Sequence, residues 1–240
     1  MPSASSPAVE TQDLIKSFGN TKVLRGLSLR IEAGATLAIL GPNGAGKTTL
    51  IKIVSGIMRP TSGQVLIEGL SLKEHAQQAR ARLGLVSHQS YLYGALSAEE
   101  NLAFYGQMYG VGELKERIRE ILAMMGLTAR RRDRVATFSR GMLQRLSLGR
   151  ALLHRPSVLM LDEPDTGLDP QALATMWDIL RRDAPNRSIV FTSHHFERTL
   201  AAASEVVILA KGKVVWRAPS HNLTLASLKE AYVHAVGEQP

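Results

Sequence analysis

The chain has 240 residues, of which 45% are hydrophobic and 21% are charged, which is typical of a soluble globular protein with one large or two small domains. No apolar run of about eighteen residues occurs, so we expect no transmembrane helix. The absence of cysteine excludes disulfides and thiolate metal sites. The formal net charge of +8 is compatible with contact to nucleic acid, anionic lipid or an acidic partner.

The N-terminal part is predicted to be rich in strands. Its first residues lack the basic and apolar regions of a secretory signal, so we expect a short disordered tail over residues 1–8. The absence of cysteine permits a cytosolic location. Short apolar or alternating runs predict strands, and apolar residues after position 48 predict one buried helix. The expected strands cover 8–18, 21–34, 35–40, 64–69 and 84–89, and the expected helix covers 48–56.

Residues 41–49, GPNGAGKTT, separate a predicted strand from a predicted helix and have the spacing of a P-loop. Glycine at 41, 44 and 46 lets successive backbone N–H groups turn inward on an anion. Lys47 can place a positive charge against the β- and γ-phosphates, and the Thr48 hydroxyl can ligate Mg²⁺. The stretch therefore predicts a nucleotide phosphate site, with a flexible glycine turn as the alternative.

Helical periodicity begins after residue 89. It predicts helices over 97–110, 112–126 and 139–156, with Ser139 as the N-cap of the third. The later elements are predicted strands over 157–163 and 188–194 around a helix near 170–183, then a hairpin with a Lys211-Gly212 turn and a last helix near 222–236. We therefore expect an α/β nucleotide-binding core formed by residues 9–89 and 157–217. A helical subdomain, residues 90–156, is inserted into this core, and a C-terminal helix covers residues 218–240.

The predicted strand over 157–163 ends in two acids, Asp162 and Glu163. A P-loop fold needs a carboxylate at this place for the Mg²⁺ shell, and Asp162 suits that task. Glu163 points to the opposite face, where it could orient and deprotonate an attacking water. The alternative is that both acids cap the next helix.

Five motifs occur in the order found in ABC-transporter ATPase subunits, and the chain resembles that family from about residue 9 to 217. They are GPNGAGKTT, Gln89, FSRGMLQRL, LMLDEPDTGLD and SHHFER. The resemblance implies a P-loop ABC ATPase core with an N-terminal antiparallel β region and an inserted α-helical subdomain, with ATP and Mg²⁺ as ligands.

The resemblance also implies roles for single residues. Phe18 looks like the aromatic residue that stacks on adenine, with a core phenylalanine as the alternative. His194 is similar to the switch histidine, so the expected catalytic residues are Glu163, His194 and Lys47. The expected Mg²⁺ ligands are Thr48, Gln89 and Asp162. The expected ATP-binding residues are Phe18, Gly41, Pro42, Asn43, Gly44, Ala45, Gly46, Lys47, Thr48, Thr49, Gln89, Ser139, Gly141 and Asp169.

The signature motif FSRGM departs from the commonest form, LSGGQ, at Phe138, Arg140 and Met142. It keeps Ser139 and Gly141, which in the family contact the γ-phosphate bound by the opposite subunit. The resemblance therefore implies a head-to-tail dimer of identical or different chains, while the effect of Arg140 stays open. Asp169 looks like the D-loop aspartate that faces the opposite subunit.

The family drives a separate membrane permease, so we expect a peripheral subunit on the cytoplasmic face of the cell membrane and no nucleic-acid partner. Residues 91–102, YLYGALSAEENL, would line the groove for the permease's coupling helix, with subdomain core as the alternative. The arginine-rich run over 130–134 is a solvated loop, or it faces lipid headgroups or an acidic partner surface. His75, His88 and His221 are lone histidines of structural or solvated type.

Two other classes compete with a transporter subunit. A soluble ABC ATPase acting on ribosomes or DNA usually carries two fused ATPase domains or a long insert, and a regulatory module without turnover would not need both Glu163 and His194. For cargo, FSRGMLQRL followed by RALLHRP looks like the ATPase subunit of the haem exporter of cytochrome c maturation. It also resembles general drug or lipid export ATPases, and we favour the haem exporter.

Overall fold

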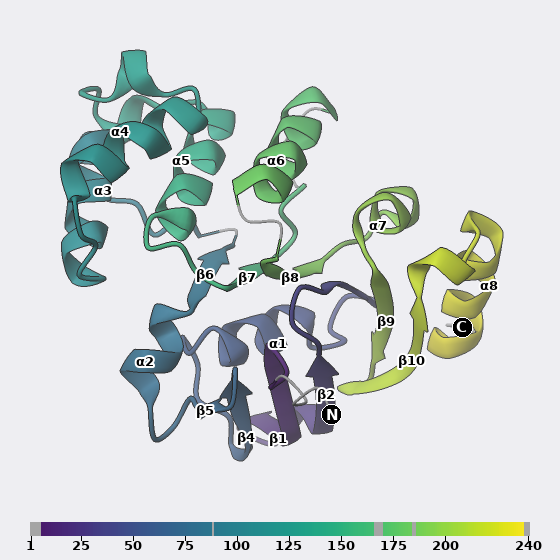
Figure 1. The fold of residues 1–240 in the computed structure, drawn as a ribbon. Helices are drawn as coiled ribbons and strands as arrows, with labels where there is room; N and C mark the ends of the chain where they lie inside the picture. Colours follow the sequence, from purple (N-terminus) through teal and green to yellow (C-terminus); the bar gives the residue numbers. More distant parts are fainter. Residues whose placement is uncertain (1–5, 88, 166–169, 184–185, 238–240) are drawn as a thin grey trace, which may run out of the picture.

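The computed structural model describes residues 6–87, 89–165, 170–183 and 186–237, which form two sheets and a set of helices (Figure 1). The strands are β1 (Val9–Phe18), β2 (Thr21–Ile31), β3 (Thr36–Leu40), β4 (Ser62–Ile67), β5 (Leu70–Ser71), β6 (Leu83–Val86), β7 (Val158–Leu161), β8 (Ser188–Thr192), β9 (Glu205–Ala210) and β10 (Lys213–Pro219). The helices are α1 (Lys47–Val54), α2 (Ala76–Ala81), α3 (Ala98–Met108), α4 (Leu114–Met124), α5 (Arg140–Leu152), α6 (Pro170–Asp183), α7 (Phe196–Ala202) and α8 (Leu225–Val236).

The larger sheet has the strand order β10-β9-β3-β8-β7-β6, and only β10 runs antiparallel to its neighbour. Parallel strands end at the same edge, so the residues that follow β3, β7 and β8 are brought together there. The smaller sheet, β2-β1-β4-β5, is antiparallel throughout. This arrangement confirms the predicted α/β class with an N-terminal antiparallel region.

Helix α1 lies in a hydrophobic core shared by the two sheets. Its Leu50 packs with Leu37 and Ile39 of β3, whereas Ala38 and Leu40 belong to a second core on the opposite face of the large sheet. Alternate residues of a strand point to opposite faces, so an uninterrupted apolar strand such as β3 requires cover on both sides. Burial on both faces fixes the position of the loop that joins β3 to α1.

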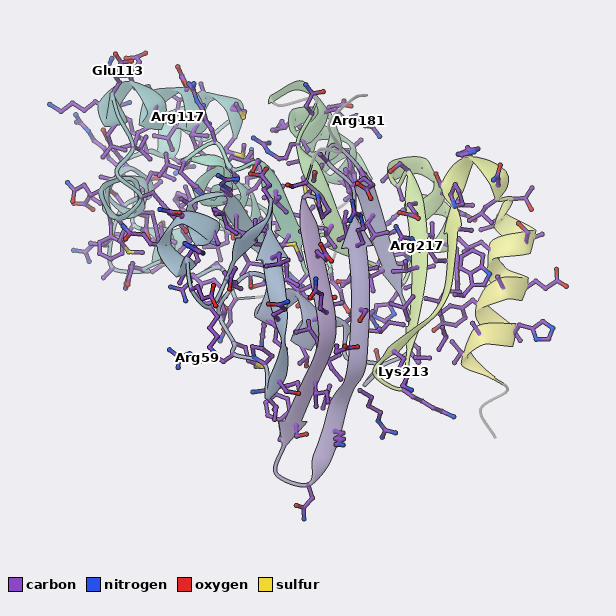
Figure 2. All side chains as sticks on the ribbon, turned by 60° about the horizontal axis from the view of Figure 1, so that its bottom comes forward. Arg59, Glu113, Arg117, Arg181, Lys213 and Arg217 are labelled. Atoms are coloured by element: carbon purple, nitrogen blue, oxygen red, sulfur yellow. The ribbon has the colours of Figure 1, made fainter. Side chains whose placement is uncertain are left out.

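Helices α3, α4 and α5 form a block on one side of the molecule, away from β10 and α8 (Figure 1). Figure 2 shows Glu113 and Arg117 on this block and Lys213 and Arg217 on the opposite side. The buried Arg117 guanidinium donates to the carbonyls of Leu152 and Leu153, at 2.8 and 3.1 Å, and ties α4 to the end of α5. The block falls within the predicted helical subdomain.

Several predicted boundaries are wrong. The predicted strand over 84–89 ends at Val86, so Gln89 lies in the loop beyond β6. Residues 6–8 of the expected tail are ordered, because Pro7 and Ala8 are buried and the Ala8 carbonyl accepts from the Glu68 N–H at 3.1 Å. Helices α2 and α7 were not predicted, because their six and seven residues are too few for a clear helical period.

Candidate nucleotide-binding and hydrolysis site

Residues 41–46 form a tight loop between β3 and α1 that only glycine can build at key positions. Gly41 has a φ of 153°, and a Cβ there would lie 2.2 Å from the Leu209 carbonyl oxygen. Gly46, the N-cap of α1, has a φ of 103°, and no side chain caps the helix. The uncapped N–H groups of the first turn therefore remain available to an anion, as the predicted P-loop requires.

Lys47 is buried, and its Nζ donates to the carbonyls of Gly41 and Pro42 at 2.7 and 3.1 Å. Burial lowers the pKa of the Lys47 ammonium, while the carboxylates of Glu163 and Asp162 act in the opposite direction. The ammonium is thus held within the loop by neutral carbonyl groups, and an anionic phosphate group would be a stronger partner for it.

Asp162 lies directly after β7, is buried, and accepts from two hydroxyl groups at one oxygen. Thr48 Oγ1 is 3.2 Å and Thr192 Oγ1 is 3.0 Å from Asp162 Oδ1. Mg²⁺ prefers few protein oxygens and completes its shell with water and phosphate oxygens. The donor set of one hydroxyl and one carboxylate fits that ion. Thr192 was not predicted as a site residue. The only signal for it in the sequence is a polar side chain at the end of a mostly apolar strand.

Glu163 and His194 contact each other at the same sheet edge. His194 Nε2 lies 2.8 Å from Glu163 Oε1, and the Glu163 N–H donates to Thr192 Oγ1 at 2.8 Å. Glu163 has a φ of 50°, which is unusual for a residue with a side chain. The structure thus brings Lys47 and His194, which are distant in the sequence, together with the adjacent acids Asp162 and Glu163.

Other predicted site residues lie apart from this cluster. Gln89 is exposed, and no hydrogen bond joins its side chain to Thr48 or Asp162 in the described part of the chain. Phe18 is 48% exposed at the end of β1, with Lys16 Nζ 5.0 Å from its ring centroid, so the alternative of a core phenylalanine is wrong. Asp169 lies outside the described residues.

Ser139 begins α5 as the sequence predicts. Its side chain accepts from the Met142 N–H at 3.3 Å, and both Ser139 and Arg140 are exposed. A Cβ on Gly141 would meet no atom of the described residues within 4 Å. The first turn of this helix therefore presents an open surface.

A groove of about 310 Å³ separates the core from the helical block. Tyr91, the first residue of the stretch 91–102 that is predicted to contact the permease, lines this groove. Arg150 is buried between the rings of Tyr91 and Tyr105, whose centroids lie 5.6 and 5.1 Å from its Cζ. Its Nη2 donates to the Leu85 carbonyl at 2.7 Å, and its Nε has no partner among the described residues. Burial lowers the pKa of the Arg150 guanidinium.

The stretch 91–102 divides between the two predicted roles. Tyr93 is 50% exposed and packs edge-on against Phe104, with ring centroids 5.1 Å apart. Ala98 and Leu102 are fully buried in the core of the block. Buried Asn101 joins the two parts, because its side chain bonds both the N–H and the carbonyl of Tyr93.

The other candidate groups that the structure describes lie on the surface. His75 and His221 are exposed, and His88 lies outside the described residues. Within the arginine-rich run, exposed Arg130 pairs with Asp133 at 3.0 Å. These contacts agree with the interpretation of the run as a solvated loop.

Sequence comparisons identify relatives over most of the chain. The family model described as "ABC transporter" matches residues 24–166. The linearmycin resistance ATP-binding protein LnrL of Bacillus subtilis is 34% identical over 86% of this chain and 68% of that protein. A daunorubicin resistance ATP-binding protein of Streptomyces coeruleorubidus is 34% identical over 87% and 67%. The Nod factor export ATP-binding protein I of Paraburkholderia xenovorans is 36% identical over 92% and 73%.

Solved structures share the fold. An ATP binding subunit of an ABC transporter matches with a TM-score of 0.86 and 29% identity, covering 95% of this chain and 99% of that chain. A dimeric ATP-binding cassette bound to ADP and Pi matches with a TM-score of 0.81 and 24% identity, over 88% and 98%. Within the described ranges, none of the helices has the length and apolar character needed to span a membrane. The chain belongs to the ABC transporter family, as an ATP-binding subunit with ATPase activity.

Proposed function

We propose that the cluster at the edge of the large sheet hydrolyses ATP, with Glu163 as the general base. The contact between His194 Nε2 and Glu163 Oε1 at 2.8 Å carries this proposal, because it fixes the carboxylate beside the phosphate loop. His194 orients Glu163, and Lys47 stabilises negative charge on the phosphates. Thr48 and Asp162 would hold Mg²⁺, with Gln89 approaching from its loop, and the ion would neutralise charge on the phosphate oxygens.

The nucleotide is held mainly by backbone groups. Residues Asn43–Thr49 wrap the phosphates with the N–H groups of the loop and of the first turn of α1. The exposed ring of Phe18 stacks on adenine, since an exposed aromatic face beside a cation at the end of a strand is free to bind a base.

Ser139 and Gly141 complete the site of a second chain. Their open surface at the start of α5 supports this role, because an N-terminal helix turn and a hydroxyl group together favour an anion. Two chains would therefore enclose two ATP molecules head to tail, and Asp169 would face the opposite subunit. Arg140 adds a positive charge beside this surface.

Complementation tests the shared site. Lys47→Ala and Ser139→Ala chains each lose activity alone, because every site of either homodimer is damaged. In a mixed dimer one of the two sites combines the intact Lys47 of one chain with the intact Ser139 of the other. If half of the dimers are mixed, about a quarter of all sites are intact, so mixing restores up to about a quarter of wild-type turnover. If mixing restores no turnover, or if Ser139→Ala alone stays active, the shared site is refuted.

The groove between the core and the helical block is the proposed docking place of a membrane permease, which would hold the chain at the cytoplasmic face of the membrane. Among the described residues its lining includes the cations Arg80 and Arg150 and no acidic side chain, so it suits an apolar helix that carries a carboxylate. Exposed Tyr93 and Phe104 extend the apolar surface beside it. Aromatic groups and arginine are enriched at protein interfaces.

The cargo is proposed from the relatives. Their names refer to linearmycin resistance, daunorubicin resistance and Nod factor export, so the expectation of haem export finds no support among them. We propose that the chain drives export of an antibiotic-like organic compound. The test reconstitutes the chain with its co-purified permease in vesicles and measures ATP turnover with daunorubicin or with haem. Stimulation by haem alone would contradict this proposal.

A further inference from the structure

Asp165 makes an ion pair beside the hydrolysis cluster that the proposed chemistry does not use. It follows Glu163 by two residues, and its side chain is 9% exposed. Arg198 Nη1 from α7 lies 3.3 Å from Asp165 Oδ2, and His195 Nε2 lies 3.7 Å from the same oxygen. A carboxylate that is largely removed from water is held firmly by such partners, since separating the pair would leave a buried charge.

This ion pair belongs to a series of contacts that join the segment after β7 to the last residue of β8 and to the segment that follows β8. Thr192 Oγ1 donates to Asp162 and accepts from the Glu163 N–H, and His194 then contacts the Glu163 carboxylate. Asp165 and α7 make the last contact in the series. The two segments are therefore fastened on both sides of Glu163.

Glu163 needs such support because of its backbone. Its φ of 50° lies in the left-handed region, which costs about 1–2 kcal/mol for a residue with a Cβ. A conformation of this kind persists only where surrounding contacts hold it. On the other side of the segment, Gln144 Nε2 donates to the Pro164 carbonyl at a long 3.4 Å, so the ion pair of Asp165 is the stronger restraint following Glu163.

We propose that Asp165 is a positioning residue for ATP hydrolysis. Its ion pair with Arg198 fixes the segment after Glu163 against α7, so that the Glu163 carboxylate stays in contact with His194. This inference rests on the proposed role of Glu163 as the general base. It does not involve the phosphate loop, so loss of the pair affects the chemical step and not the binding of ATP.

The test measures kcat and KM for ATP in Asp165→Ala, Arg198→Ala and the double variant. Each single variant lowers kcat about tenfold and leaves KM within about twofold, because a base displaced by a fraction of an ångström loses its alignment. The double variant is no slower than the slower single variant, since both remove one interaction. Asp133→Ala, which breaks the exposed pair with Arg130, is the matched control and keeps the wild-type kcat.

Several outcomes overturn the inference. If Asp165→Ala keeps the wild-type kcat, even with a lower melting temperature, the ion pair of Asp165 with Arg198 stabilises the fold only and has no role in catalysis. Multiplicative losses in the double variant show that the two residues act separately. If Asp165→Ala does not fold, Asp165→Asn keeps the shape without the charge, and a wild-type kcat there overturns the inference equally.

Glu163→Gln, measured in parallel, separates this inference from the proposed function. If Glu163→Gln is inactive while Asp165→Ala keeps its kcat, only the role of Asp165 fails. If Glu163→Gln keeps full turnover, the assignment of the base fails and the positioning role fails with it.

Discussion

Acidification is predicted to loosen the junction between the helical block and the core through His154. This residue follows α5, its Nε2 donates to the Leu83 carbonyl of β6 at 3.0 Å, and its ring stacks on Tyr109 with centroids 3.9 Å apart. Its Nδ1 is buried and has no partner among the described residues. Burial is the main cause that lowers the pKa of His154 from 6.5 to about 4, with nearby arginines acting in the same direction.

The sign and size of the effect follow from that pKa. Above pH 6.5 the imidazole is neutral in both the folded and the unfolded chain, so His154 adds no pH dependence. Between pH 6.5 and about 4 only the unfolded chain takes up the proton, so the free energy of unfolding falls by about 1.4 kcal/mol per pH unit. Between pH 7 and pH 5 the loss from this one group is therefore about 2 kcal/mol.

Urea unfolding at pH 7 and pH 5 measures this loss by comparison with His154→Gln. Glutamine keeps a donor for the Leu83 carbonyl and does not titrate, so the stability difference between wild type and variant shrinks by about 2 kcal/mol at pH 5. His221→Gln, at an exposed histidine, controls for removal of an imidazole. A difference between wild type and His154→Gln that stays constant within about 0.5 kcal/mol would refute the reasoning.

Three further predictions concern the phosphate loop and the adenine position. Gly41→Ala places a Cβ 2.2 Å from the Leu209 carbonyl oxygen, so we expect thermal unfolding without nucleotide to show a free energy of unfolding lower by at least about 2 kcal/mol. In Gly44→Ala the added Cβ meets no atom of the described residues within 4 Å, so this variant loses less stability. Equal losses in the two variants would contradict this prediction. Lys47→Ala weakens binding of a fluorescent ATP analogue at least about tenfold without lowering the melting temperature, and unchanged affinity would remove Lys47 from the site. Phe18→Ala weakens the same binding by about 1 kcal/mol, roughly fivefold, and Phe18→Trp restores it; equal affinity in all three would exclude stacking.

The local parts of the site are predictable from the sequence because backbone geometry demands particular residues at fixed spacing. Gly41 and Gly46 occupy conformations that a side chain would strain, so the P-loop is readable without any tertiary information. Ser139 likewise caps α5 through a contact only three residues away. These backbone conformations are set by nearby residues of the chain, and the structure confirms the positive φ of both glycines and the N-cap at Ser139.

The contacts between distant segments could not be predicted in the same way. The meeting of His194 with Glu163 depends on β8 lying beside β7, a pairing across a large sequence separation. Thr192 gains its role only from that pairing, and the same holds for Asp165 and Arg198, which lie 33 residues apart. Gln89 was wrongly predicted to lie in a strand. Strand β6 ends at Val86 because its pairing with β7 ends there, and the sequence of β6 alone does not show where that pairing stops.

The most direct test of the account compares ATP turnover and association state in wild type and Glu163→Gln, each purified alone and supplied with Mg²⁺-ATP. Glu197→Gln, at an exposed glutamate in α7, is the matched control and should behave as wild type. We predict that Glu163→Gln loses turnover while still binding ATP, and that it elutes as an ATP-dependent dimer because the nucleotide is no longer consumed. Full turnover in Glu163→Gln would show that Glu163 is not the base and that the site assignment is wrong.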